Sequence, residues 1–253
     1  MTTNTLPEHR NFENAPIKEA IVDISFPEIP EDKLPIIESL ESDFKDEFPN
    51  KKTMRRIYQT LGFKEGQPSN SSSEFSTAGY QFWAQDEVED LVTCRRDGFS
   101  YNKLKPYSEW SKLLEKALIG WEKYKAKIQP TVLNKLSVRN INLIEIPQTR
   151  FELEDYFATS PNLPPAINRD MEDFLMRFII DFSEKNAKCL VTMASQPPTT
   201  EGYALILLDI EAFCYVNTLP NDEQISEILT SLNHIKDIVF FKSLKEKTLE
   251  LFV

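Results

Sequence analysis

The sequence has few of the residues on which most catalytic and metal sites depend. It contains two histidines in 253 residues. His9 lies in a polar N-terminal segment, and His234 lies on the side of an expected helix that faces away from its apolar stripe. Neither histidine is placed for acid–base chemistry, and the His/Cys spacing of a zinc site does not occur. We therefore expect no metal site and no cofactor.

Glycine and cysteine are scarce as well. The six glycines form neither GxGxxG nor GxxxxGK[ST], which disfavours a Rossmann or P-loop nucleotide site. Cys94, Cys189 and Cys214 lie singly in apolar runs without a CxxC pair. This pattern is typical of buried thiols in a reducing compartment, not of a disulfide framework.

Long apolar runs are missing too. No run approaches the roughly 20 residues that span a bilayer, and the N-terminal segment lacks the apolar centre of a signal peptide. We expect a cytoplasmic protein without a membrane partner. The net charge of −11 repels phosphate groups, so nucleic acid is a disfavoured partner unless a local basic patch exists.

What the chain does contain is a series of periodic segments separated by proline and polar turns. We expect strands at 17–26, 56–63, 79–84, 91–95, 99–104, 131–146, 174–183, 188–194 and 203–216. Helical spacing predicts helices at 34–48, 108–128 and 152–157. Asn221 with Gln224, and Ser243 with Glu246, predict two further helix starts. The polar stretch 65–73 is expected to be a loop, and Asp97-Gly98 a hairpin turn.

This order predicts an α+β fold: a mixed, largely antiparallel sheet with helices on one face. We expect a flexible arm at 1–16 and two tightly joined parts at 17–147 and 166–253, with a proline-rich connection at 148–165.

Charged and amide side chains inside expected strands are the first candidate site. They are Arg139, Asn142, Arg177, Asp209 and Glu211. A charge in a central strand needs a partner, so Arg139 or Arg177 with Asp209 would form a structural ion pair. The alternatives are a polar cleft that binds an anionic ligand, or catalysis.

A second candidate is the densest basic cluster, formed by Lys51, Lys52, Arg55 and Arg56. With Tyr58 nearby, it could contact single-stranded nucleic acid. A solvated strand or loop end explains the same residues.

Several segments resemble a family of sporadically distributed bacterial proteins without an assigned function. The family's opening Asn-x-Pro-Ile-x-Glu-Ala strand matches 14–20, and an LxxRYINRIxIP-like strand matches 136–147. Asp155-Tyr156-Phe157 precedes a proline pair, and an LxLDID-like strand matches 207–211. The chain departs from the family at Asn140, Leu143 and Glu211. A patchy distribution implies an association with mobile or defence-linked genes.

We therefore expect a non-catalytic protein that binds a macromolecule, most simply another protein, in a toxin–antitoxin or phage-defence assembly. The alternatives are an enzyme or small-ligand sensor that uses an arginine–carboxylate cleft, and nucleic-acid binding through 51–56. The oligomeric state is open.

Overall fold

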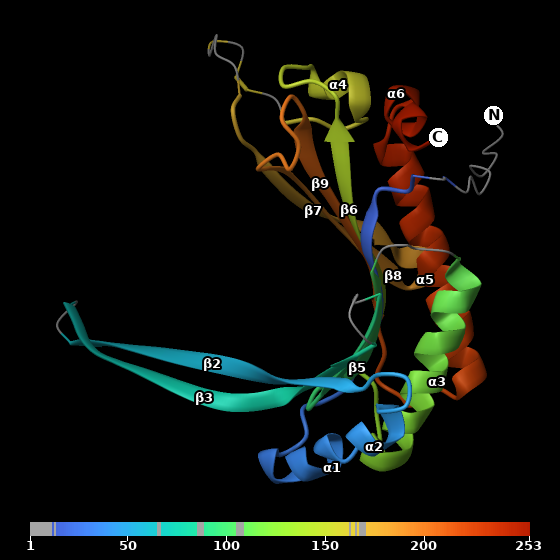
Figure 1. Cartoon of the computed structure of the whole chain (residues 1–253). Helices are drawn as coiled ribbons and strands as arrows, with labels where there is room; N and C mark the ends of the chain where they lie inside the picture. Colours follow the sequence, from blue (N-terminus) through green and yellow to red (C-terminus); the bar gives the residue numbers. More distant parts are fainter. Residues whose placement is uncertain are drawn as a thin grey trace.

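One antiparallel sheet of nine strands forms the body of the protein (Figure 1). The computed structural model describes residues 12, 14–64, 67–84, 89–104, 109–161, 163–164, 166 and 171–253; for 59–64 and 67–74 it describes the backbone alone. The strand order is β2-β3-β4-β5-β1-β6-β9-β8-β7, and every neighbouring pair is antiparallel. The expected α+β class is therefore confirmed.

All nine expected strands are present, but β2 and β3 are much longer than expected. The strands are β1 (Ile17–Ser25), β2 (Asn50–Lys64), β3 (Gln67–Trp83), β4 (Asp90–Arg95), β5 (Gly98–Leu104), β6 (Lys135–Ile146), β7 (Leu175–Phe182), β8 (Ala187–Gln196) and β9 (Ala204–Tyr215). The helices are α1 (Leu34–Glu38), α2 (Glu41–Phe44), α3 (Trp110–Ile128), α4 (Leu153–Tyr156), α5 (Asp222–Ser243) and α6 (Glu246–Leu249). Short 3-10 turns occupy Glu31–Lys33, Ser183–Lys185 and Glu250–Phe252.

The two long helices, α3 and α5, cover one face of the sheet (Figure 1). Alternate residues of β1 and β6 point toward them and are buried, in the period-2 pattern of a strand with one covered face. Trp121 and Tyr124 of α3 are fully buried against Phe99 of β5. Burying each such aromatic side chain contributes about 2–3 kcal/mol, so this face supplies most of the apolar stabilisation.

The sheet is continuous across the connection expected at 148–165. β6 pairs with β1 on one side and with β9 on the other, over twelve residue pairs from Lys135–Tyr215 to Ile146–Ala204. Residues 17–147 and 166–253 therefore contribute to one sheet. In the N-terminal segment 1–16, which was expected to be flexible, Phe12 packs on the Phe252 ring and Asn14 donates a backbone hydrogen bond to Phe252. Residues 1–11 and 13 lie outside the described residues.

Three expectations about local structure are wrong. The helix expected at 34–48 is broken into α1 and α2, although its apolar residues, including Ile37 and Phe44, are buried as the spacing predicts. Residues 67–73, expected in a loop, belong to β3, because pairing with β2 outweighs their polar composition. Ser243 does not cap α6; its hydroxyl donates to the Val239 carbonyl as the last residue of α5.

The helix α5 begins as the sequence predicts. The Asn221 side chain accepts from the Gln224 backbone N–H at 2.8 Å, and the Gln224 side chain accepts from the Asn221 N–H at 3.0 Å. These two bonds satisfy N–H groups that a helix start leaves unpaired. In the part of the chain that the structure describes, no helix combines the length and the apolar composition needed to cross a membrane.

The hairpin of β2 and β3 projects far beyond the rest of the sheet (Figure 1). β3 pairs with β4 only over Gly79–Trp83, and the Ala78 carbonyl accepts from the Arg96 N–H at 2.9 Å; the part of β3 before Ala78 pairs with β2 alone. We call the two-stranded part, residues 55–77, the arm. The register shifts between Met54 and Arg55, next to Gly79. Such a bulge bends and twists a strand pair, so the arm leaves the sheet at this position.

Candidate functional site

The sheet face opposite α3 and α5 is rich in charged and polar side chains, and we call it the open face. Cross-strand pairing places Arg139 of β6 directly opposite Glu211 of β9 on this face. The same pairing aligns Asp209 of β9 with Thr192 of β8 and Arg177 of β7. Four of the five candidate strand residues therefore share one face, because directly opposed residues point the same way.

Arg139 and Asp209 form a two-pronged ion pair. Arg139 Nε donates to Asp209 Oδ1 at 2.7 Å, and Nη2 donates to Oδ2 at 2.6 Å. The hydrogen bonds to Asp209 raise the pKa of Arg139. Two N–H groups of the guanidinium are therefore already bound to a carboxylate of the same chain. Arginine uses this same two-pronged geometry to hold a carboxylate or phosphate ligand. From the sequence, either Arg139 or Arg177 could pair with Asp209. In the structure the partner of Asp209 is Arg139.

The other strand candidates make no hydrogen bond to this pair. Glu211 accepts from Lys135 of β6. Asn142 lies on the helix-covered face, fully buried, and donates to the Leu208 carbonyl at 2.8 Å. Arg177 is exposed near the sheet edge and, within the described residues, makes no ion pair. The five candidates therefore do not converge on one cleft.

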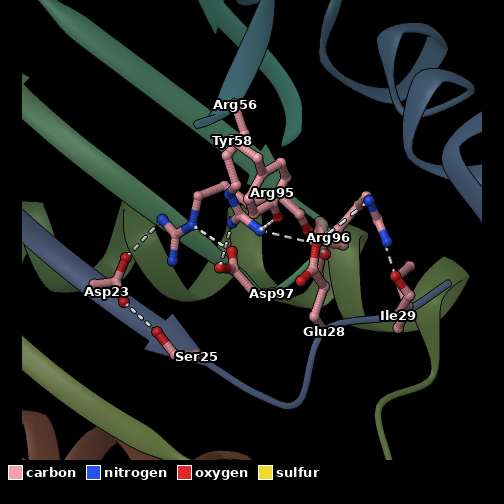
Figure 2. A network of polar contacts seen from close by, with 10 residues as sticks. Asp23, Ser25, Glu28, Ile29, Arg56, Tyr58, Arg95, Arg96 and Asp97 are labelled. Carbon is pink, nitrogen blue, oxygen red and sulfur yellow. Dashed lines mark hydrogen bonds and ion pairs between the residues drawn. The ribbon is translucent and has the colours of Figure 1, made fainter. Parts of the chain in front are cut away.

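A larger ion-pair network lies on the open face where the arm begins (Figure 2). We call it the arm-base network; its members are Asp23, Glu28, Arg56, Arg95, Arg96 and Asp97. Arg95 contacts Asp23 at 2.7 Å and Asp97 at 3.0 Å. Arg56 contacts Asp97 and Glu28, each at 3.0 Å. Three cations face three carboxylates, so the network is neutral and bridges β1, β2 and the β4–β5 turn.

The balance of charges in this network is visible in its pKa shifts. Burial works against the charge of Arg95, but Asp23 and Asp97 outweigh it and raise its pKa. The pKa of Arg56 is raised by its hydrogen bond to Tyr58, together with Glu28 and Asp97. Both guanidinium groups stay charged at any physiological pH. The sequence interpretation missed this network, because it treated Asp97-Gly98 only as a turn.

The basic cluster at 51–56 is divided by the strand geometry. Lys51 pairs with Glu38 and Glu41, at 3.0 and 2.7 Å, and lies over the Tyr80 ring. Arg56 belongs to the arm-base network. Lys52 and Arg55 are exposed, and successive strand residues point to opposite faces, so the four charges do not form one surface.

A buried polar group under α5 also escaped sequence interpretation. Lys236 is almost fully buried and contacts Asp237 at 2.8 Å, to which Asn233 donates at 3.1 Å. These residues alternate with the apolar positions that define the α5 stripe, so periodicity hides them. The nearby Cys189 thiol is buried, and burial raises its pKa to about 12. All three cysteines are buried free thiols, as their apolar surroundings predict.

Side chains with metal-binding chemistry do not gather in the described part of the chain. No group of three or more His, Cys, Asp or Glu side chains has metal-ligand geometry there. His234 is partly exposed on α5, and His9 lies outside the described residues. Comparisons with protein-family models, with curated proteins and with solved structures give no match for this chain.

Proposed function

We propose that this chain is a non-catalytic protein-binding protein and that the arm is its main binding element. The observation that carries the proposal is the exposed apolar pair at the root of the arm. Ile57 and Phe75 lie directly opposite each other across β2 and β3, and they are 56% and 66% exposed. Tyr58 is exposed on the other side of the ribbon.

The architecture of the arm supports this proposal. A two-stranded ribbon without a third strand or a covering helix is marginally stable in water, and its apolar side chains gain burial when another surface covers them. Large apolar and aromatic side chains are also the residues that dominate protein interfaces. The arm-base network fixes the root of the ribbon, so a partner would meet a held element instead of a freely moving one.

The wider setting of the proposal comes from the sequence. We propose a cytoplasmic assembly of the toxin–antitoxin or phage-defence type, as the resemblance implies, with another protein as the partner. We also propose that 17–147 and 166–253 form two tightly joined parts, and that the arm belongs to the first part. The alternatives are an enzyme or small-ligand sensor that uses an arginine–carboxylate cleft, and nucleic-acid binding through 51–56.

A photo-crosslinking amino acid at position 75 tests the proposal in the native host. We expect one stoichiometric second protein to be captured from position 75, because Phe75 lies in the contact surface. The same amino acid at Ile119, an exposed apolar position on α3, is the matched control. The double variant Ile57→Ser/Phe75→Ser should lose the complex while circular dichroism stays unchanged. Equal capture from positions 75 and 119, or an unaffected complex in the double variant, would refute the role of the arm.

A further inference from the structure

The strand β7 is the edge of the sheet farthest from the arm, and its backbone has a defined free side. In the described part of the chain β7 pairs with β8 and has no strand on its other side. The Ser195 N–H donates to the Phe174 carbonyl, and the register continues as Leu175–Ala194. In an antiparallel pair, alternate residues direct both backbone groups toward the neighbour. The even-numbered residues therefore bond to β8, and the odd-numbered residues direct N–H and C=O outward.

The same odd-numbered residues carry the side chains of β7 that lie on the open face. Ile179 is aligned through Leu190 and Glu211 with Arg139. Leu175 and Ile179 are 71% and 57% exposed. Arg177 and Asp181, which flank Ile179, are exposed as well. The free edge thus presents one cation and one carboxylate, placed symmetrically about an exposed isoleucine.

This pattern is complementary to itself. When two copies of β7 run antiparallel with Ile179 opposite the partner's Ile179, Arg177 lies opposite the partner's Asp181, and Asp181 lies opposite the partner's Arg177. All of these are odd-numbered residues, so each pair exchanges two N–H···O hydrogen bonds. Opposite charges in directly opposed positions are favourable, and they lie on the same face in both copies.

Other symmetric registers of the same strand lack this match. Registers centred on Arg177 or on Asp181 place like charges opposite each other. Registers centred on Phe178 or on Ile180 place a charge opposite an apolar side chain. In a register that aligns odd-numbered with even-numbered residues, the N–H and C=O groups that point out of one copy meet residues whose own backbone groups point toward β8. No row of hydrogen bonds can then form between the two copies.

We propose that two copies of this chain associate through β7, with a two-fold axis beside Ile179, and that their sheets join into one. The occupant of the β7 edge is a second copy because the charge pattern and the phase of the backbone groups both select the same register. On the helix-covered side, Phe178 then lies opposite the partner's Ile180, which extends the apolar layer across the interface. The proposal does not depend on the arm.

Sedimentation equilibrium of the full chain tests the association. We expect a species of twice the chain mass of 29.3 kDa. The charge reversals Arg177→Asp and Asp181→Arg should each weaken it about tenfold or more, because each creates two like-charge pairs. Both positions are exposed, so the variants should keep the fold by circular dichroism, although Asp181→Arg loses the hydrogen bond from Ser183 and faces Lys188 of its own chain.

Mixing the two single variants gives the sharpest result. In a mixed dimer, each of the two positions again faces an opposite charge, so we expect a dimer to form from two weakly associating preparations. The double variant Arg177→Asp/Asp181→Arg should also dimerise alone. A wild-type monomer at all concentrations, or a dimer that ignores both reversals, overturns the proposal. A different protein captured at β7 by a monomeric chain overturns it as well.

Crosslinking tests the register independently. A short bismaleimide should join two copies of Ile179→Cys, since the opposed residues lie about 5.5 Å apart between Cα atoms. Leu175→Cys is the matched control, because its sulfur would lie roughly 27 Å from its own counterpart along the antiparallel strands. The native cysteines among the described residues are buried. Equal crosslinking at the two positions contradicts the register.

Discussion

The two edges of this sheet differ in the sign pattern of their charges. β2 carries Lys51, Lys52, Arg55 and Arg56 and contains no acidic residue, so antiparallel pairing with a copy of itself brings like charges together. Its carboxylate partners come from elsewhere in the same chain. β7 carries one cation and one carboxylate around an exposed isoleucine. Natural sheets avoid edge-to-edge pairing with charges of one sign, and the comparison indicates that β2 has this protection whereas β7 does not.

The largest expected change in the free energy of unfolding comes from replacing the glycine where the arm leaves the sheet. Gly79 has a φ of 153°, and a Cβ placed there would lie 2.1 Å from the Cys94 carbonyl oxygen. We expect Gly79→Ala to lower the free energy of unfolding by about 3–5 kcal/mol, because backbone cannot yield as a flexible side chain can. Urea unfolding measures this change.

Gly202→Ala is the matched control for the glycine experiment. Gly202 also has a positive φ, of 82°, but nothing lies within 4 Å of the position of its Cβ. We expect a loss of about 1 kcal/mol, due to backbone strain alone. Equal losses for both glycines would show that the close approach to Cys94 does not hold the root of the arm.

The next largest effect should come from the arm-base network. Arg95→Met leaves Asp23 without its cation in a site where the arginine side chain is 20% exposed. We expect a loss of about 2 kcal/mol in the free energy of unfolding, because an unpaired, partly buried carboxylate is costly. Arg139→Met, in the half of the open face nearer to β7, should cost about 1 kcal/mol, since Arg139 is 40% exposed. Among the described residues Arg139 pairs with Asp209 alone, whereas Arg95 pairs with both Asp23 and Asp97. The opposite ranking would mean that the β7 half depends more on its ion pairs.

The smallest expected effect concerns pH and one carboxylate at the start of β4. Burial works to raise the pKa of Asp90, but hydrogen bonds from Tyr101 at 2.7 Å and Lys116 at 3.0 Å outweigh it and lower the pKa. Its stabilisation is therefore present above the unfolded-state pKa near about 4 and is lost as the pH falls through the lower folded-state value. Asp90→Asn should cost about 1 kcal/mol at pH 7 and much less at pH 2.5. A constant difference across this range would exclude the titration of Asp90 as its cause.

Sequence periodicity predicted the elements whose apolar faces are buried by their own chain. The stripe of α3, the capping box of α5 and the runs of β1 and β9 all have local signals. Residues 67–73 failed because their strand depends on a partner strand, not on their own composition. The 34–48 helix failed because burial of every third or fourth residue is also satisfied by two short helices.

Candidate site residues were predictable only where a charge interrupts an apolar strand. Arg139 and Asp209 stood out for this reason, and their ion pair follows from adjacent strands. Arg95 and Arg96 did not stand out, because a hairpin turn explains polar residues without any network. Ile179 did not either, because an apolar residue in a strand is expected to be buried, and only the strand order shows that β7 is an edge.

The position of β6 between β1 and β9 has a consequence for synthesis of the chain. β6 needs β9 on one side, and α4, β7 and β8 are all made before β9. A chain leaving the ribosome therefore carries an open β6 edge, rich in branched apolar residues, while the rest of the sheet is still being translated. Pairing between distant segments is slow, and open edges attract other chains. We therefore expect the nascent chain to be exposed to wrong pairing from the emergence of β6 until β9 (Ala204–Tyr215) has emerged.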